Sequence, residues 1–436
     1  MALCVIGDTM MDKKKVIVVG CGSRGKTYTD IMKSDFGDDF KVVACAEPID
    51  DRRNYIQKEH SIPADMCFKS WEPIFERQKF ADLVIIATMD RDHFAPAMAA
   101  IEKGYNLLLE KPIAATPEEC RIIQKAAEKK GVFVLVCHVL RYTRFFMALK
   151  SIIDSGEIGK VMNIQAIECV GDVHQSHSFV RGNWGNSEKS SCMILQKTCH
   201  DMDILAWLIG KKCTEVHSFG SLSYFKRENA PKGSPEYCYQ GCPVGDTCPY
   251  NAEKVYVDMK YGGEGWLDFV ATEKVAPTKE DCMQAVRKTS YGKCVFKCDN
   301  NVVDHQTVNL KFGDDVYVDF AMSAFTEGGR ILRIMGTQGE IDAKMKGDQI
   351  KIFNFLTRET RKYDFDSAAA GENITGGHGG GDTGIIYALR DLMNGKISNS
   401  VCGVGESCDN HMISFAAEES RLTGKVIDMT KFEASF

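Results

Sequence analysis

Residues 16–25 read VIVVGCGSRG and decide the fold of the first third of the chain. A short β-branched run, residues 16–19, leads into a glycine-rich turn, and Tyr28, Ile31 and Met32 follow at helical spacing. Only glycine permits both the tight turn and a close approach of the backbone to a pyrophosphate, which the helix N-terminus then attracts. The stretch therefore predicts a dinucleotide-binding turn, whose contact residues are Gly20, Gly22, Ser23, Arg24 and Gly25.

The strand and helix signals of this unit are repeated through the first third of the chain. Near-continuous apolar runs at residues 42–46, 83–88, 106–109 and 132–137 alternate with helical patterns such as residues 94–103 and 117–130. Such strands must be covered on both faces, which is typical of a doubly wound parallel sheet. We predict an α/β Rossmann domain over residues 13–138.

The pattern changes after this domain. Strand character dominates, with few crossover helices, at residues 161–170, 216–224, 256–259, 266–272, 316–322, 331–335 and 349–355. This pattern of many strands and few helices predicts an α+β domain, residues 139–436, with a large, mostly antiparallel open sheet. The open face of the sheet could bind a substrate.

Composition excludes several classes of protein. The chain has 436 residues and a net charge of −6, from 54 Lys and Arg against 60 Asp and Glu, with the two signs mixed along its length. Because the two signs are mixed, the sequence has no cluster of basic residues of the kind that binds nucleic acid. The longest apolar run, residues 132–137, is far too short to cross a bilayer, and residues 1–15 do not resemble a leader. We expect a cytoplasmic protein without a membrane or nucleic-acid partner, in which most of the 18 cysteines are reduced.

An acidic residue strengthens the dinucleotide interpretation. Glu47 ends the second strand, 22 positions after Gly25, where its carboxylate can accept hydrogen bonds from both ribose hydroxyls of an adenosine. The alternative is a glycine turn with no ligand. A carboxylate at this position repels a 2′-phosphate and favours NAD over NADP, although Arg52 and Arg53 follow closely and moderate the preference.

A second motif, Glu110, Lys111 and Pro112, ends a strand of the same sheet. Ligands of open α/β sheets bind at the carboxyl ends of the strands, so a lysine there can polarise a hydroxyl or a carbonyl. The alternative is a surface lysine paired with a glutamate. The position of the motif in the sheet favours a catalytic role for Lys111.

Together with the glycine turn and Glu47, the segments ATMDRDHFAPAMAAIEKGYNLLLEKP (residues 87–112) and LRYTRFFMALKSIIDSGEIGKV (residues 140–161) resemble the Gfo/Idh/MocA oxidoreductases. The resemblance implies that Lys111 contributes to catalysis, that Glu110 contacts the nicotinamide ribose and that the peptide bond before Pro112 is cis. It also implies that Thr88 and His93 line the nicotinamide end and that Arg24 contacts the pyrophosphate. The resemblance further implies a homodimer or homotetramer, formed through the large sheet.

The segment QKTCHDMD, residues 196–203, supplies the candidate general base. His200 begins a helix, and an imidazole is suited to proton transfer near neutral pH. The family pattern has an Asp four residues before this histidine, whereas Gln196 stands here. Asp201 or Asp203 is then the candidate to orient His200, Lys197 can serve with Lys111, and Lys197 and Asp203 are candidate substrate contacts. The alternative for His200 is a hydrogen-bonded core histidine.

Cysteines cluster at one place, YCYQGCPVGDTCPYNA, residues 237–252. Cys238, Cys242 and Cys248 are spaced so that three thiols can converge on a soft metal, for which structural zinc is the redox-inert choice. The alternatives are coincidence, a disulfide between Cys238 and Cys248, and, less favoured, an iron–sulfur cluster. The fourth ligand stays open between Cys192, Cys213, Cys294 and a histidine.

Residues 376–382, GGHGGGD, precede a helix and predict either a ligand-binding loop or a flexible linker. The stretch also resembles a loop of the NAD-dependent α-N-acetylgalactosaminidase branch of the family, which implies that His378 and Asp382 hold sugar hydroxyls. Arg181 and Trp184, in HSFVRGNW, offer a planar donor and an aromatic face to the same kind of ligand. Surface or core packing is the alternative for both.

These residues predict an NAD-dependent oxidoreductase that transfers a hydride between nicotinamide and a secondary hydroxyl of a sugar, a polyol or a sugar derivative. One alternative is a redox-neutral NAD-dependent glycosidase, which oxidises carbon 3 transiently and eliminates the glycosidic group. A second alternative, suggested by Gln196, is an NAD-binding sensor without catalysis.

Overall fold

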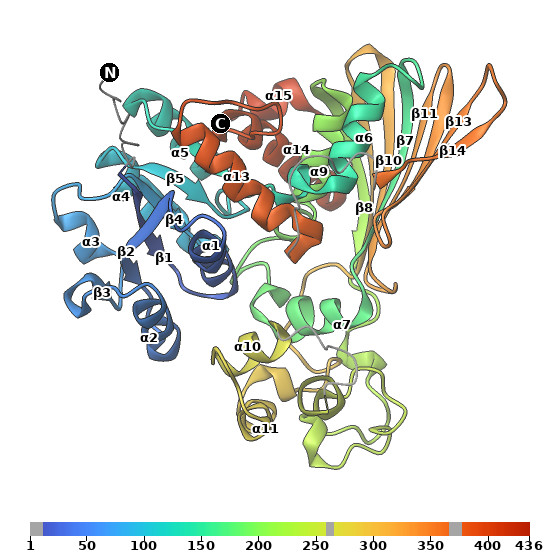
Figure 1. The fold of residues 1–436 in the computed structure, drawn as a ribbon. Coiled ribbons are helices and arrows are strands. Elements are labelled where there is room, and N and C mark those ends of the chain that lie inside the picture. Colours follow the sequence, from blue (N-terminus) through green and yellow to red (C-terminus); the bar gives the residue numbers. More distant parts are fainter. Residues whose placement is uncertain (1–11, 259–265, 366–376) are drawn as a thin grey trace, which may run out of the picture.

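Two β-sheets organise the structure, a computed structural model that describes residues 12–258, 266–365 and 377–436 (Figure 1). The first sheet lies in the N-terminal third and the second in the rest of the chain. Residues 222–304 are inserted between two strands of the second sheet, and the described part of this insertion consists of short helices and loops. The predicted α/β plus α+β architecture is confirmed.

The first sheet is parallel throughout, with the strand order β3-β2-β1-β4-β5-β6. Its strands are β1(Lys14–Val19), β2(Phe40–Ala46), β3(Cys67–Phe68), β4(Leu83–Ile86), β5(Asn106–Leu109) and β6(Val134–Val136). Every residue of β4 and β6 is buried, as near-continuous apolar strands require. The order reverses beside β1, and a sheet of this kind binds its ligand at the carboxyl ends of the strands next to that reversal.

The helices of this domain begin and end where local chemistry dictates. They are α1(Ser23–Ser34), α2(Asp50–Glu59), α3(Glu72–Glu76), α4(Phe94–Glu102) and α5(Pro117–Lys130). In α5 the Thr116 side chain accepts a hydrogen bond from the backbone N–H of Glu119, and Gly131 ends the helix at a φ of 68°. Threonine at the start and glycine at the end are the residue types that favour these two positions.

A helix from far along the chain completes the core of the first domain. Helix α13(Gly381–Met393) packs beside α1, and its residues Ile385, Ile386 and Leu389 are buried with Val16 and Tyr28 (Figure 1). One side of the first sheet is thus covered by a segment that the sequence assigned to the second domain. The boundary at residue 138 remains a prediction.

The second sheet has nine strands in the order β14-β13-β12-β11-β7-β10-β9-β8-β15, antiparallel except for the pair β7 and β10. The strands are β7(Val161–Cys169), β8(Cys213–Ser221), β9(His305–Phe312), β10(Val316–Ser323), β11(Gly329–Gly336), β12(Gly339–Lys344), β13(Gln349–Asn354), β14(Thr360–Lys362) and β15(Ile427–Asp428). Buried and exposed residues alternate along them, so one face is open.

Helices cover the other face of this sheet. They are α6(Arg144–Asp154), α8(Met193–Gln196), α9(Cys199–Ile209), α14(Val404–Thr423) and α15(Met429–Glu433), and they share one apolar core with the strands. Among the residues that the structure describes, no helix is both long enough and apolar enough to span a bilayer.

Two predicted strands are wrong. Residues 266–272 form helix α10(Trp266–Thr272), and Tyr256 lies in a π-helix, η8(Glu253–Val257), while Met259 lies outside the described residues. Leu267 and Ala271 are four positions apart and pack in one small core, so the run WLDFVAT fits a helix as well as a strand. Periodicity alone cannot separate the two in so short a run, and packing within the insertion decides it. The insertion also contains helix α11(Lys279–Lys288).

Candidate active site

The glycine turn has the shape that a dinucleotide requires. Gly20 has a φ of 88°, and a Cβ there would lie 2.5 Å from the carbonyl oxygen of Ala87. A Cβ on Gly25 would lie 2.0 Å from the carbonyl oxygen of Gly20, whereas one on Gly22 would meet only the Nη1 of Arg52, at 3.8 Å. Helix α1 begins directly afterwards without a side-chain cap or an acid in its first turn. Its N-terminal N–H groups therefore suit a pyrophosphate, and the turn fits the cofactor.

Glu47 is buried at the carboxyl end of β2 and is oriented by the backbone around it. Its Oε2 accepts a hydrogen bond from the N–H of Cys21 at 2.7 Å, and its Oε1 accepts one from the N–H of Ile49 at 3.0 Å. Each oxygen keeps a second lone pair. The carboxylate is thus held against the glycine turn, at the position from which it can accept ribose hydroxyls.

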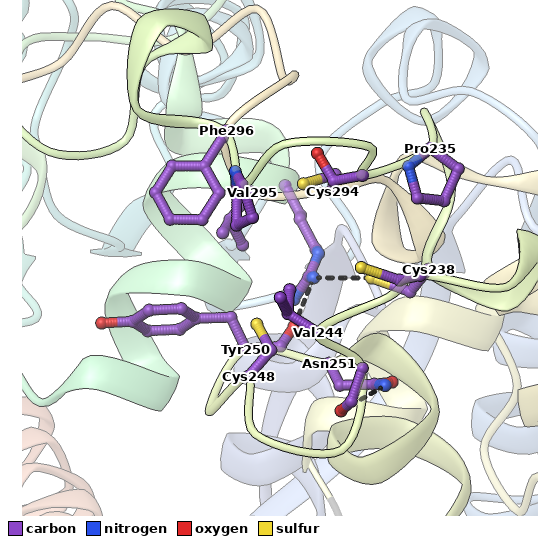
Figure 2. Close-up of a pocket in the computed structure, with 14 residues that line it drawn as sticks. Pro235, Cys238, Val244, Cys248, Tyr250, Asn251, Cys294, Val295 and Phe296 are labelled. Carbon is purple, nitrogen blue, oxygen red and sulfur yellow. Dashed lines mark hydrogen bonds between the residues drawn. The ribbon is translucent and has the colours of Figure 1, made fainter.

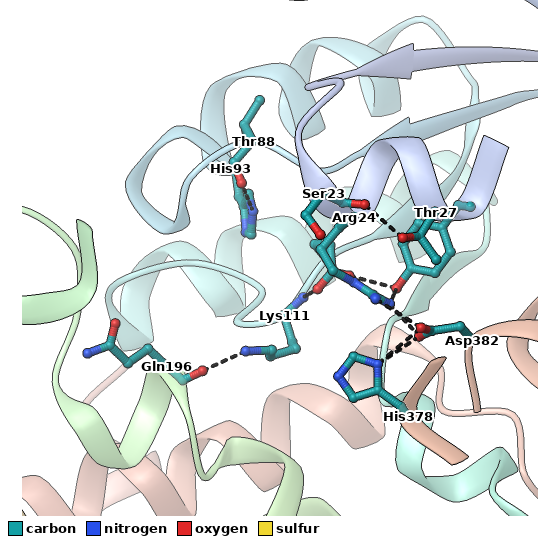
Figure 3. A network of polar contacts seen from close by, with 11 residues as sticks. Ser23, Arg24, Thr27, Thr88, His93, Lys111, Gln196, His378 and Asp382 are labelled. Atoms are coloured by element: carbon teal, nitrogen blue, oxygen red, sulfur yellow. Dashed lines mark hydrogen bonds and ion pairs between the residues drawn. The ribbon is translucent and has the colours of Figure 1, made fainter. Parts of the chain in front are cut away.

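Lys111 follows β5 and extends toward α8 (Figure 3). Its Nζ donates a hydrogen bond to the carbonyl oxygen of Gln196 at 2.6 Å, and the peptide bond to Pro112 is cis. The amide of Gln196 itself points elsewhere, because its Nε2 donates to the carbonyl oxygen of Trp184 at 2.9 Å. Gln196 therefore positions Lys111 through its backbone, although it lacks the carboxylate of the family pattern.

Arg24 is held by acids in this structure. Its Nε donates to Glu110 at 2.8 Å, and its Nη atoms donate to both oxygens of Asp382 at 3.1 and 2.6 Å (Figure 3). Tyr28 also donates to Glu110, at 2.6 Å. Burial would raise the pKa of Glu110, but the Arg24 and Lys111 cations outweigh it, so its pKa lies below the ordinary value. The predicted contact of Arg24 with a pyrophosphate would require the guanidinium to share or leave these partners.

Thr88 and His93 lie beside the cis peptide. The His93 ring stands between the carbonyl oxygens of Pro112, 2.7 Å from Nδ1, and Thr88, 3.2 Å from Nε2. The Thr88 hydroxyl donates to the carbonyl oxygen of Asp92 at 2.9 Å. Both residues thus shape the loop that follows β4, next to the Lys111 loop.

His200 lies on the first turn of α9, with 8% of its surface exposed. Its Nδ1 is buried and has no hydrogen-bond partner among the described residues. Burial lowers the pKa of His200 well below the ordinary value, and the nearby Lys111 cation lowers it further. The imidazole is therefore neutral at neutral pH and retains a lone pair that can accept a proton.

Neither candidate carboxylate orients His200. Asp201 binds Arg330 through two hydrogen bonds of 2.7 and 3.0 Å, and Asp203 binds Arg141 through two of 2.8 and 2.7 Å. Asp203 is fully buried, which argues against the predicted contact with a substrate. The spacing in sequence was compatible with orientation of His200, but both acids pair with arginines that approach from other elements.

Lys197 faces a carboxylate from the second sheet. Its Nζ lies 3.2 Å from Oε1 of Glu168 on β7, and Arg330 on β11 lies 2.9 Å from Oε2 of the same residue. Burial lowers the pKa of Lys197, and the Arg330 and Lys111 cations act in the same direction. Glu168 and Arg330 were missed by the sequence analysis, because their pairing depends on the register of β7 and β11.

His378 and Asp382 lie next to Arg24. The Nδ1 of His378 is 3.1 Å from Asp382 Oδ2, and the His378 side chain is 46% exposed. The pKa of Asp382 lies well below its ordinary value, because Arg24 and His378 more than compensate for burial. Gly376, the first residue of the predicted loop, lies outside the described residues.

Family models match both parts of the chain. Residues 14–138 match the oxidoreductase family with an NAD-binding Rossmann fold, and residues 146–239 match the Gfo/Idh/MocA C-terminal domain. The chain belongs to the Gfo/Idh/MocA oxidoreductase family. The predicted membership is confirmed, and the first domain is an NAD-binding Rossmann domain.

Relatives within the Gfo/Idh/MocA family act on sugars and polyols. The inositol 2-dehydrogenase of Salmonella typhimurium is 26% identical over 280 residues, which are 63% of this chain and 77% of that one. The 2,7-anhydro-N-acetylneuraminate hydratase of Mediterraneibacter gnavus is 25% identical over 203 residues, 47% of this chain and 51% of that one. Levoglucosan dehydrogenase, solved with NADH and levoglucosan, has a TM-score of 0.69 at 15% identity and covers 96% of this chain and 99% of its own. The likeness to that structure shows the shared fold.

His174 is a further member of this Gfo/Idh/MocA site that sequence reasoning missed. It ends the short helix α7(Asp172–His174), and a π-helix, η4(Gln175–Arg181), follows it directly. Burial lowers its pKa well below the ordinary value, and Lys197, His177, Lys111 and His378 contribute to the shift. The His174 ring packs against Phe179, with the ring centroids 5.4 Å apart. A π-helix frequently marks a functional site, but GDVHQSHS shows no pattern that predicts one.

Two predicted substrate contacts are occupied by other partners. The Trp184 Nε1 donates to Asp90 at 3.0 Å. The Arg181 Nε and Nη2 donate to the carbonyl oxygens of Lys293 and Tyr250, at 2.8 and 2.6 Å, inside the insertion. Cys238, Cys242 and Cys248 line the same small cavity as Arg181 (Figure 2). The structure thus brings Arg181 to the cysteines, and its contact with a sugar remains only a prediction.

Proposed function

We propose that this protein is an NAD-dependent dehydrogenase that oxidises a secondary hydroxyl group of a sugar, a polyol or a sugar derivative. One observation carries the proposal: the buried Nδ1 of His200 has no partner among the described residues, and Lys111, whose cation acts on the same imidazole, is held by the carbonyl oxygen of Gln196, four residues before His200. A neutral base beside a fixed cation suits the removal of a proton from a hydroxyl group.

The residues that would hold the cofactor are the glycine turn, the N-terminus of α1 and Glu47. The cis Lys111–Pro112 loop and the Thr88 to His93 loop would line the nicotinamide end, with Glu110 on the ribose as the family resemblance implies. When bound, NAD supplies the hydride acceptor. The carboxylate of Glu47 would repel a 2′-phosphate, which supports NAD over NADP.

His200 and Lys111 divide the proton chemistry between them. His200 accepts the hydroxyl proton, for which its neutral state is required. Lys111, held by the Gln196 carbonyl, stabilises the negative charge that develops on the substrate oxygen. Lys197, His174 and His378, which precedes α13, are the candidates to contact neighbouring hydroxyl groups. The burial of His200 strengthens its electrostatic interactions.

A redox-neutral reaction is the second candidate, and a specific observation favours it. His378 is held by Asp382 through Nδ1, which leaves Nε2 of an exposed imidazole for a second proton transfer. Glycoside cleavage through a transient ketone needs one base for the hydroxyl and another for the neighbouring C–H. One relative is a hydratase, so net oxidation is not the outcome of every family reaction.

A homo-oligomer is proposed for the open face of the second sheet. Met162, Ile167, Tyr317 and Ile331 are exposed on neighbouring strands, and Ile167 pairs with Ile331. An apolar stripe of this kind is more stable against a second copy than in water. Light scattering of the purified protein should give two or four times the chain mass of 48.5 kDa, and a mass of 48.5 kDa would refute the homo-oligomer.

One experiment separates these functions. The purified protein is denatured to release bound nucleotides, and the native protein is then incubated with NAD and a panel of sugars, inositols and aryl glycosides. An increase in NADH absorbance on incubation with a sugar or an inositol supports the dehydrogenase function. Release of the aryl group without NADH, with solvent deuterium at carbon 2, supports the redox-neutral reaction. Tight NAD binding without turnover would support a sensor, and no NAD binding would refute the proposal.

A further inference from the structure

A fourth cysteine joins the cluster that the sequence singled out. Cys238, Cys242, Cys248 and Cys294 all line one cavity in the insertion, and Figure 2 shows Cys238, Cys248 and Cys294 around it. The fold brings Cys294 there through local strand-like pairing: Tyr237 pairs with Lys293, and the Cys294 N–H donates to the carbonyl oxygen of Glu236 at 2.8 Å. Of the candidates for a fourth ligand, Cys294 therefore lies with the other three.

The size of the cavity favours a single ion. It has a volume of about 20 Å³, room for about one water-sized sphere. An iron–sulfur cluster, with its several metal and sulfide atoms, does not fit such a space. No three of the four thiols lie within 4.8 Å of one another in the described part of the chain, so binding requires the loop of residues 238–248 to close. That loop contains Gly241, Pro243 and Gly245 and only one short 3₁₀ turn, so it can close without breaking a long helix.

Arg181 provides an independent observation at this cavity. Its side chain lines the cavity and is only 2% exposed, and its Nη1 has no hydrogen-bond partner among the described residues. Its Nη2 lies 3.7 Å from the sulfur of Cys238. Within the described residues its hydrogen bonds go to two carbonyl oxygens and to the sulfur of Cys238, and to no carboxylate, although a buried cation is costly without an anion. Thiolates on a metal would supply that anion.

We propose that Cys238, Cys242, Cys248 and Cys294 bind one zinc-type divalent cation as four thiolates. Binding replaces four S–H bonds by four metal–sulfur bonds and releases four protons, with no change of oxidation state. The resulting centre carries two negative charges, and Arg181 compensates for one of them. Zinc prefers this closed, tetrahedral thiolate set for a structural role.

The site would stabilise the insertion against the NAD-binding domain. The insertion contacts that domain through the Val275 N–H, which donates to Asp51 at 2.8 Å, and through Phe269, whose ring lies 4.9 Å from the Arg52 guanidinium carbon. The ion would join residues 238–248 to Cys294. The residues that make these two contacts lie between those points in the sequence. Loss of the ion should therefore loosen the insertion.

Metal content tests the proposal directly. Protein expressed with added zinc and purified without chelator should contain about one zinc per chain by plasma mass spectrometry, and Cys294→Ser should lose most of it. Cys298→Ser is the matched control, because Cys298 is near Cys294 but does not line the cavity, and it should retain the zinc. Zinc lost from Cys298→Ser but kept by Cys294→Ser, or absent from the wild type, would overturn the assignment.

The wild-type protein gives a second test that does not depend on the folding of a variant. Cobalt added to chelator-treated protein should give the thiolate charge-transfer and tetrahedral ligand-field bands. Alkylation of the four cysteines should rise on chelator treatment, while that of Cys298 does not. A mass lower by two hydrogens before reduction would show a disulfide, and iron with sulfide would show a cluster; either would refute the proposal. NAD binding is measured in parallel, so failure of the metal site and failure of the proposed function are separable.

Discussion

Arg24 and Asp382 form a two-bond ion pair across 358 positions of sequence, with N–O distances of 2.6 and 3.1 Å. Arg24 stands on the helix that would receive the cofactor phosphates, and Asp382 stands at the start of α13. Because Arg24 also donates to Glu110, the pair connects the glycine turn, the Lys111 loop and the C-terminal region. The geometry of the cofactor site thus depends on a helix from the far end of the chain.

Asp382→Asn should lower the free energy of unfolding by about 2 kcal/mol, because the change removes the anion from a largely buried pair while Glu110 still partners Arg24. Urea unfolding measures this loss, and Asp391→Asn, farther along α13 and more exposed, should change it by less than about 0.5 kcal/mol. In a double-mutant cycle with Arg24→Gln, additive effects would show that the pair contributes no coupling.

Lys111→Met should lower turnover at least ~100-fold while NAD affinity changes little, because the ammonium acts on charge that develops in the transition state. Steady-state kinetics and NAD titration measure the two quantities on the substrate that the panel identifies. Lys129→Met, an exposed position on α5, is the control and should behave as wild type. Unchanged turnover in Lys111→Met would remove this residue from the mechanism.

His200→Gln should lower turnover by about 10²-fold or more, since general base catalysis typically contributes a factor of this size. The more informative measurement is its pH dependence. Hydroxide can replace the lost base, so turnover of the variant should rise with pH more steeply than that of the wild type. Equal slopes would indicate that His200 is a packing residue, which is the ordinary alternative for a buried histidine.

Glu47→Gln should weaken NAD binding about 10-fold and narrow the preference for NAD over NADP, because the amide no longer repels a 2′-phosphate. Fluorescence titration with NADH and NADPH measures both affinities. Glu59→Gln, at the half-buried far end of α2, is the control for a simple loss of charge. The role of Glu47 is refuted if both affinities fall equally.

Acid should destabilise this protein through its buried histidines. Burial lowers the pKa of His138 to about 4 and those of His177 and His411 to about 3, from an ordinary value of 6.5. Below pH 6.5 the unfolded chain therefore binds protons that the folded chain does not, so this contribution to stability is full above pH 6.5 and is lost as the pH falls through about 4 and about 3. At about 1.4 kcal/mol per pH unit for each group, the three histidines give a slope of up to about 4 kcal/mol per unit.

Urea unfolding between pH 7 and pH 4.5 or so measures this slope. His411→Gln should reduce the slope of the unfolding free energy against pH by the contribution of about one proton, whatever its effect on stability at neutral pH. His305→Gln is the control for the substitution itself, because that imidazole is half-exposed on β9 and not buried. Stability that does not depend on pH over this range would contradict the assignment of neutral, buried rings.

Local sequence signals were enough to predict the parallel strands of the first sheet. Local signals suffice there, because the glycine turn needs a positive φ at Gly20 and the buried parallel strands must be apolar along their whole length. Helix caps such as Thr116 are equally local. Lys111 could be placed at the ligand-binding edge of the sheet from the sequence, because it comes almost directly after a predicted strand.

Side-chain partners that are far apart in the sequence could be identified only from the tertiary structure. Asp203 pairs with Arg141, Arg24 pairs with Asp382, and Cys294 joins three cysteines more than 40 positions away, and no local pattern specifies these partners. The secondary structure of short apolar runs such as residues 266–272 could not be predicted either. A run of so few residues fits both the helical and the strand periodicity, and packing then selects one of them. Side-chain partners depend on how elements pack across the whole fold, whereas turns and buried strands depend on backbone chemistry close in sequence.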